Sequence, residues 1–268
     1  MVRNSVTLFL ILIGAAGCGG AVEQSPPVGP SNPPHQAAPV SRIEPPKPAE
    51  PSGSVEPAKP TETRTPPAVP SNDELYAEAI RKAAVFEQAN VLQVKTIPPD
   101  TARVKVVTWT RYDYKLGASS VGVNVWVTLV PEVREICRGF KGAEADIDLR
   151  LKQLLGLPLT AGYTQFVEME VRREDIFRPC PNPDPQLSTC ADIFPQGVSP
   201  DHATFIATQS LSSFKLPGGY PWTRLGYTFD WSPEAKSRYG ASEFVVRKGS
   251  KVNVTSITKS AAYCAPQG

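Results

Sequence analysis

Residues 218–244 hold the densest group of side chains in this sequence that could do chemistry. Tryptophans, tyrosines, an arginine and acidic residues follow one another closely there. Aromatic ring faces can stack on a ligand, and fixed polar groups can orient it. One interpretation of the segment is therefore a glycan- or peptide-binding groove, with the ligand-binding candidates Trp222, Arg224, Tyr227, Trp231 and Tyr239.

Two acids in this segment, Asp230 and Glu243, could form an acid/base pair of the kind that cleaves glycosidic bonds. Arg224 or His202 would support them, so these four residues are the catalytic candidates. The structural alternative is that the tryptophans cover one end of a sheet while Arg224 pairs with Asp230 or Glu243 to brace the loop. His202, alone beside Asp201, is expected to be a surface or hydrogen-bonded histidine. We favour the structural alternative, and the sequence leaves enzymatic activity undecided.

Several other functions lack their usual motifs. The chain has no G-x-S-x-G nucleophile elbow, no phosphate-binding glycine loop and no acidic calcium loop. Two histidines are too few for a multi-histidine metal site, and a net charge of +2 is too small to predict nucleic-acid binding. We therefore expect no cofactor, no metal and no nucleic-acid partner.

The first twenty residues have the pattern of an export signal. A short basic stretch at residues 1–3 precedes an apolar run at 6–13, which is shorter than the roughly 20 residues needed to span a bilayer. Residues 15–18, AAGC, resemble the bacterial lipobox, although lipoboxes usually carry Leu where Ala15 stands. The alternative is an ordinary secretory signal in which Cys18 is incidental.

The lipobox resemblance covers residues 1–20 only and implies that Cys18 becomes the mature N-terminus and carries acyl chains. Multiple chains would anchor the protein stably in a membrane. In Gram-negative lipoproteins, a residue other than Asp after the cysteine usually goes with transfer to the outer membrane, and residue 19 is Gly. The resemblance thus predicts an exported, lipid-anchored protein, placed in the outer membrane if the source is Gram-negative.

Proline dominates the segment that follows. Fifteen of the 29 prolines fall between residues 21 and 70, and no aromatic residue occurs between Phe9 and Tyr76. Such a segment cannot bury enough apolar area to offset its ordering entropy. We predict three parts: a signal peptide (1–17), a lipidated cysteine with a disordered proline-rich linker (18–72), and a single globular domain (73–268). A ligand for a proline-recognition module is the alternative for the linker.

The remaining cysteines, Cys137, Cys180, Cys190 and Cys264, all lie in the predicted domain. Four cysteines in an exported domain predict two disulfides, with three pairings open. We favour Cys180–Cys190, which closes a local proline-rich loop, and Cys137–Cys264, which ties the C-terminal tail to the domain. A four-cysteine zinc site is the alternative, but no C-x-x-C spacing supports it.

The pattern of apolar residues predicts the elements that position these side chains. A capping box at Ser71–Glu74 and helical spacing up to Phe86 predict an amphipathic helix, and residues 145–155 predict a second one that ends at Gly156. Strands are expected at 103–110, 121–129 and 167–171, and a terminal hairpin at 243–247 and 251–257. The alternating valines of 121–129 should face a core, with Trp126 under a loop or second layer.

Helices and strands do not alternate regularly, so we predict an α+β fold: a mainly antiparallel sheet, two or more packed helices and a long disulfide-stapled loop region. The string at 218–231 resembles one in an uncharacterised exported bacterial family of unknown function. The hypothesis is therefore a binding or structural module of the cell envelope, with a glycan, peptide or protein ligand. The alternative is an envelope glycan hydrolase that uses Asp230 and Glu243.

Overall fold

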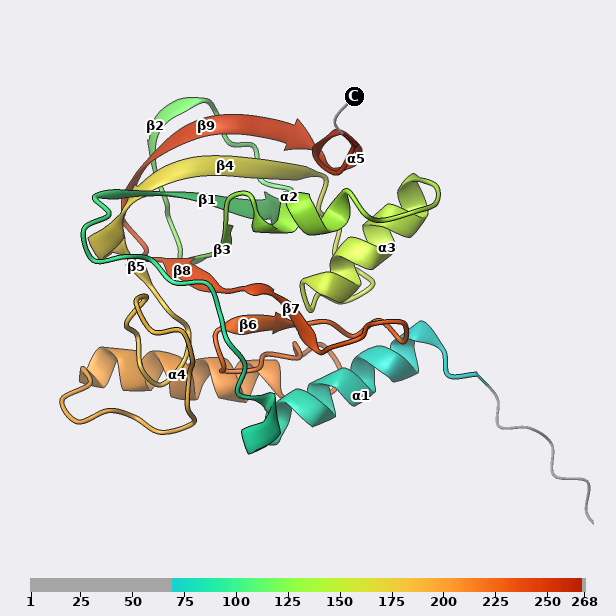
Figure 1. Cartoon of the computed structure of the whole chain (residues 1–268), viewed down its shortest axis with the longest axis horizontal. Coiled ribbons are helices and arrows are strands. Elements are labelled where there is room, and N and C mark those ends of the chain that lie inside the picture. Colours follow the sequence, from blue (N-terminus) through green and yellow to red (C-terminus); the bar gives the residue numbers. More distant parts are fainter. Residues whose placement is uncertain (1–68, 267–268) are drawn as a thin grey trace, which may run out of the picture. The chain divides into compact units, whose positions relative to one another are not determined.

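The computed structural model describes residues 69–266. The predicted signal peptide, the lipidation site at Cys18 and almost all of the predicted linker lie outside the described residues. Figure 1 shows an α+β arrangement, as predicted, with an antiparallel sheet and helices on several sides of it.

A seven-stranded sheet with the order β2-β9-β4-β1-β3-β8-β5 forms the centre, and every pairing in it is antiparallel. Its strands are β1 (Arg103–Thr110), β2 (Gly117–Ser120), β3 (Val125–Leu129), β4 (Gln165–Arg172), β5 (Ile176–Phe177), β8 (Phe244–Val246) and β9 (Lys251–Lys259). A separate hairpin consists of β6 (Tyr227–Phe229) and β7 (Tyr239–Ser242).

The sheet has an inner and an outer face, because successive side chains of a strand point to opposite sides. The inner face carries the main hydrophobic core, with Val106, Val167, Met169, Phe244 and Val254 among its buried members. The sheet curves around this core, so that β5 and β8 lie below β1 and β4 in the view of Figure 1. The outer face carries the alternate residues of the same strands; helices cover part of it, and Lys105, Lys251 and Asn253 on it are exposed.

Two groups of helices cover the outer face (Figure 1). Helices α2 (Glu132–Cys137), α3 (Glu144–Leu154) and α5 (Ser260–Tyr263) pack over Val107 and Phe166. Helix α4 (Pro200–Ser213) lies over the other end, where Phe205 contacts Trp126 and Phe177. Helix α1 (Asn72–Ala84) packs on the hairpin, and the 3-10 turns η1 (Gln88–Asn90) and η2 (Arg173–Asp175) complete the elements of the described part.

Two helix ends confirm the local signals in the sequence. The backbone N–H of Glu74 donates to the hydroxyl of Ser71 at 3.3 Å, and the Glu74 carboxylate accepts from the Ser71 N–H at 2.7 Å, which is a complete capping box. Helix α3 ends at Gly156, whose φ of 64° is the left-handed conformation. The N–H of Leu157 then donates to the carbonyl of Lys152 at 2.8 Å, closing a Schellman motif.

Two strand predictions are wrong. Only Val125–Leu129 of the predicted strand 121–129 is β-strand, and Val123 is 62% exposed rather than facing the core. The predicted terminal hairpin does not form either, because β8 pairs with β3 and β5 while β9 pairs with β4 and β2. The backbone of Val121 bonds to Ser250 and Gly249, so this segment meets the β8–β9 connection instead of extending β3.

Both preferred disulfides are confirmed: Cys137–Cys264 joins α2 to the segment after α5, and Cys180–Cys190 closes the loop after β5. Two disulfides fit an extracellular or exported protein. Among residues 69–266, no helix combines the length and the hydropathy needed to cross a membrane.

Candidate ligand-binding cavity

A cavity of about 420 Å³ lies between the outer face of the sheet and the layer that covers it. It occupies the gap between α4 on one side and the segment after α3 on the other, with the residues before β6 as a roof. Its volume falls in the range of small-molecule sites, about 300–1,000 Å³. Most of its lining is aromatic or aliphatic, and the aromatic members are Trp109, Tyr112, Tyr114, Trp126, Tyr163, Phe166, Tyr220, Trp222 and Phe229.

The floor of the cavity follows from strand register. Val107 of β1 lies opposite Thr128 of β3, and Val127 of β3 lies opposite Phe244 of β8. Thr128 therefore shares the outer face with Val107, and Glu243, the residue before Phe244, comes next to it on that face. Trp126 lies two residues before Thr128 and so projects from the same side, as the alternation predicted.

A close backbone approach holds the roof against α4. The N–H of Tyr220 donates to the carbonyl of Ser213, the last residue of α4, at 2.7 Å. A Cβ atom on Gly219 would lie 2.1 Å from the same carbonyl oxygen, so only glycine allows this contact. Trp222 then packs edge-on against Trp126 and parallel to Phe214.

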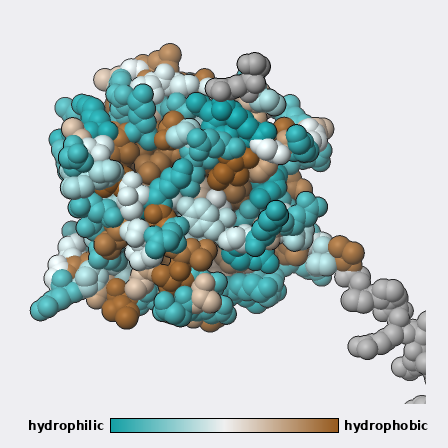
Figure 2. Space-filling model, in the orientation of Figure 1, coloured by the Kyte–Doolittle hydropathy of each residue, from teal (hydrophilic) through white to brown (hydrophobic). Residues whose placement is uncertain are grey.

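The mouth of the cavity has exposed aromatic and apolar residues, namely Tyr112, Val123 and Tyr220. Figure 2 shows that hydrophobic residues on the face in view occur in small groups separated by hydrophilic ones. On that face, the surface therefore offers no broad apolar area. The cavity, by contrast, is a concave site with a mostly apolar lining.

One part of the lining is polar. The Oγ1 atom of Thr128, the Nε1 atom of Trp222 and the Oε2 atom of Glu243 are buried and have no hydrogen-bond partner within residues 69–266. Thr128 and Trp222 are only 6% and 5% exposed. Buried polar atoms are normally paired, so such a group marks a place where a ligand can bind. We call these three residues the polar end of the cavity.

Burial raises the pKa of Glu243 to about 8. The guanidinium of Arg178 and the indole N–H of Trp222 both favour the charged form, but burial outweighs them. The indole therefore lies near the carboxyl group, although it makes no hydrogen bond of normal geometry with any group in the described residues. Burial therefore favours the protonated form of the Glu243 side chain, which can donate a hydrogen bond.

Arg178 lies behind the polar end and is completely buried. Its guanidinium donates to the carbonyls of Lys95, Pro185 and Gly226, and it stacks over the Phe244 ring at 4.3 Å. Burial lowers its pKa to about 10, so it remains a cation at neutral pH. The backbone N–H of Glu243 also donates to the Gly226 carbonyl, which places the guanidinium beside Glu243.

The ligand-binding candidates from the sequence have different positions. Trp222 lines the cavity, but Tyr227 and Trp231 are each 1% exposed and present no ring face to solvent. The Tyr227 hydroxyl donates to the Asn90 carbonyl at 2.7 Å, and the Trp231 indole donates to the Leu157 carbonyl at 3.1 Å. These side chains therefore join the hairpin to neighbouring segments, and the predicted surface groove does not form.

Tyr239 and Arg224 also have structural partners. The hydroxyl of Tyr239 donates to the buried carboxylate of Glu132 at 3.0 Å. The predicted pairing of Arg224 with Asp230 or Glu243 is wrong, because Arg224 pairs with Asp192 at 3.4 Å and donates to the carbonyl of Ala84.

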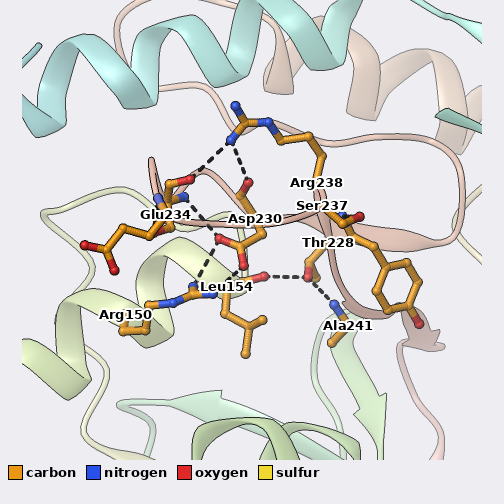
Figure 3. Close-up of polar contacts among 10 residues, drawn as sticks. Arg150, Leu154, Thr228, Asp230, Glu234, Ser237, Arg238 and Ala241 are labelled. Atoms are coloured by element: carbon orange, nitrogen blue, oxygen red, sulfur yellow. Dashed lines mark hydrogen bonds and ion pairs between the residues drawn. The ribbon is translucent and has the colours of Figure 1, made fainter. Parts of the chain in front are cut away.

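The structure does not bring Asp230 and Glu243 together. Glu243 follows β7 and bonds to Gly226 at one end of the hairpin, whereas Asp230 follows β6 and bonds to Arg238 at the other end. Gly226 and Asp230 are four residue steps apart in extended chain, on the order of 13 Å. Paired glycosidase carboxyl groups lie about 5–9.5 Å apart. Figure 3 shows Asp230 held instead by Arg150 and Arg238.

His202 is buried rather than exposed, and its Nε2 atom lies 2.8 Å from the Cys180 carbonyl oxygen. It packs between Phe177 and Phe205. Burial lowers its pKa, so the neutral imidazole is favoured there. This arrangement agrees with the hydrogen-bonded histidine that the structural interpretation expects and links α4 to the disulfide loop.

Sequence reasoning missed most of the cavity. The sequence candidates Trp222 and Glu243 do line it, and residues 124–128 gave a second signal, because Trp126 and Thr128 project from the side opposite the valines. Trp109, Tyr112 and Tyr163 gave no such signal, since they come from separate segments that meet only in the folded chain.

Comparison with known proteins assigns no relative: no protein-family model matches the chain, and no curated protein or solved structure matches it. Within the described residues, no cluster of His, Cys, Asp and Glu could hold a metal ion. The cavity is therefore the feature of the described residues that bears on function.

Proposed function

We propose that this chain is an exported lipoprotein, anchored in a membrane through acyl chains on Cys18, whose domain is a binding module of the cell envelope. Its ligand inserts a small, mostly apolar group into the cavity between β1, β3 and α4. In this proposal the group belongs to an envelope glycan, a peptide, a protein or a free small molecule. The linker of residues 18–72 would let the domain reach such a ligand away from the membrane.

The observation that carries the proposal is an aromatic cavity with one polar end. Apolar walls supply affinity through the area that they remove from water, and a few fixed polar groups supply orientation. The cavity of this domain has both features, with three tryptophans in its lining and Thr128, Trp222 and Glu243 at one place. The proposed export and lipid anchor rest on the resemblance of residues 15–18 to a lipobox, and the two disulfides fit an exported protein.

Binding is favoured over hydrolysis because the two acids proposed for hydrolysis lie at opposite ends of the β6–β7 hairpin. Asp230 is bound by Arg150 and does not line the cavity. Glu243 alone reaches the cavity, and glycoside cleavage by the usual mechanism needs two carboxyl groups.

A fluorescent probe tests whether the cavity takes up an apolar molecule. N-phenyl-1-naphthylamine, which is neutral, brightens when it leaves water and can be titrated with the purified domain. We expect saturable binding that Gln209→Trp abolishes, because Gln209 lines the cavity from α4 and a larger ring there would fill it. Leu211→Trp is the matched control, since Leu211 is exposed on the same helix. Equal binding by both variants would place the probe elsewhere and contradict the proposal.

A further inference from the structure

The polar end of the cavity, formed by Thr128, Trp222 and Glu243, limits which ligands can bind. The indole of Trp222 can only donate a hydrogen bond, the hydroxyl of Thr128 can donate one, and a protonated Glu243 can donate one. The three groups come from three elements that meet at one place: β3, the roof segment and the residue before β8. The polar end therefore offers three donors, and, although Thr128 and Glu243 can also accept, the Trp222 indole needs an acceptor, which the ligand would supply.

The surrounding charge disfavours a cationic ligand. Aromatic walls by themselves would attract a cation. The Arg178 guanidinium, however, donates to the same Gly226 carbonyl as the backbone N–H of Glu243, so a buried positive charge already lies beside this end of the cavity. A second cation would be repelled in surroundings of low dielectric.

We infer that the cavity binds a neutral, largely apolar molecule or group whose single polar atom is a hydrogen-bond-accepting oxygen, as in a ketone, ester or amide carbonyl. The oxygen lies at the polar end and accepts from Trp222, Thr128 and Glu243, while the apolar body fills the space between Trp109 and Trp126. This inference rests on the proposed binding function of the cavity and specifies the class of ligand.

Three naphthalenes of similar size test the inference: 2-acetylnaphthalene, 2-ethylnaphthalene and 2-naphthylmethylamine. Each is titrated against the domain at pH 6.5 by displacement of N-phenyl-1-naphthylamine. We expect the ketone to bind about tenfold more tightly than the hydrocarbon, as one or two well-formed hydrogen bonds would give. The ammonium compound should bind most weakly. Equal binding of ketone and hydrocarbon, or preference for the amine, would overturn the inference while leaving the cavity's binding role intact.

Failure of the proposed function gives a different result, because none of the three naphthalenes would then displace the probe from the cavity. Thr128→Val keeps the shape of the side chain and removes its hydroxyl. It should therefore weaken binding of the ketone several-fold and leave binding of the hydrocarbon unchanged. An equal effect on both compounds would show a packing role for Thr128 and contradict its role as a donor.

The dependence of binding on pH shows whether the ligand needs Glu243 as a protonated hydrogen-bond donor or as a carboxylate anion. The ionisable groups around it are Arg178 behind it, Glu132 beyond Ser242, and the phenols Tyr112, Tyr114, Tyr163 and Tyr220 toward the mouth. Arg178 loses its proton near pH 10, and burial raises the pKa of Tyr114 and Tyr163 above that of a free phenol. A change in binding between pH 7 and 9 that Glu243→Gln abolishes therefore reports on Glu243.

Wild-type protein should lose its preference for the ketone as the pH rises through 8, because the carboxylate no longer donates. Glu243→Gln keeps a neutral donor and should retain the preference across pH 6.5–9. Glu234→Gln, at an exposed glutamate, is the control and should behave like the wild type. A preference in Glu243→Gln that still falls at pH 8, or a wild-type preference that does not fall, would refute the donor role of Glu243.

Discussion

The guanidinium of Arg150 binds both carboxylate oxygens of Asp230, at 3.1 and 2.5 Å, and so joins α3 to the end of β6 (Figure 3). Asp230 is buried, and one of its oxygens also accepts from the backbone N–H of Ser232 at 3.1 Å. A carboxylate with these partners holds two layers of the structure together. Its position explains why an acid that looked catalytic in the sequence serves the fold.

Asp230→Asn should destabilise the protein without affecting the cavity. The amide leaves the Arg150 guanidinium without its counter-charge, and we expect a loss of about 2–4 kcal/mol in the free energy of unfolding. Urea denaturation measures this loss, and titration with N-phenyl-1-naphthylamine should give unchanged affinity. Glu78→Gln, which removes an exposed ion pair with Arg81, is the control and should change stability by less than about 1 kcal/mol. Lost probe binding in folded Asp230→Asn would show that Asp230 belongs to the site.

Glu243 should make the protein less stable as the pH rises. Its folded-state pKa of about 8 lies above that of glutamate in an unfolded chain, about 4.3, so its contribution to stability is complete below pH 4 and is lost as the pH rises through 8. Glu243→Gln removes this dependence. The wild type should therefore lose several kcal/mol of unfolding free energy relative to the variant from pH 4 to pH 8, at about 1.4 kcal/mol per pKa unit.

Denaturation curves of both proteins at several pH values measure that difference, and the subtraction cancels other titrating groups. His202 is one of these, because its lowered pKa makes the protein less stable as the pH falls below about 6.5. A difference that stays flat from pH 4 to 8 would mean that Glu243 titrates normally in the folded protein.

The two disulfides should contribute unequally. Cys137 and Cys264 are 127 residues apart, whereas Cys180 and Cys190 are 10 apart. In the chain-entropy model, removing the first with a double alanine variant costs about 5 kcal/mol and removing the second costs about 3 kcal/mol. Thermal or urea unfolding of the two variants gives the order. The reverse order would show that local packing of the disulfide loop outweighs chain entropy. Without reduction, the purified domain should show no thiol that an alkylating agent can label.

Cys18 should be the mature N-terminus and carry acyl chains. Mass spectrometry of the native protein from a membrane fraction of a bacterial source measures this directly, and Cys18→Ser should release the protein from that fraction. A native protein that retains Met1, has free sulfhydryls and fractionates with the cytosol would contradict both the export and the anchor.

Local chemistry explains what the sequence determined by itself. The capping box at Ser71, the helix end at Gly156 and the strands β1 and β4 depend on neighbouring residues, and all formed as predicted. The disulfide pairing was also predictable, because Cys180 and Cys190 lie close in sequence and only one pair then remained. The fold class followed from the irregular order of helices and strands.

Only the tertiary structure decided the site. The aromatic string at 218–231 had the composition of a surface groove, yet Tyr227 and Trp231 are buried because the hairpin packs between the sheet and α1. The terminal hairpin does not form because β3 and β5 occupy both edges of β8, while β2 and β4 occupy both edges of β9. The cavity joins residues from segments more than a hundred positions apart, such as Trp109 and Glu243. No local pattern encodes such a meeting, because the register and curvature of the whole sheet set it.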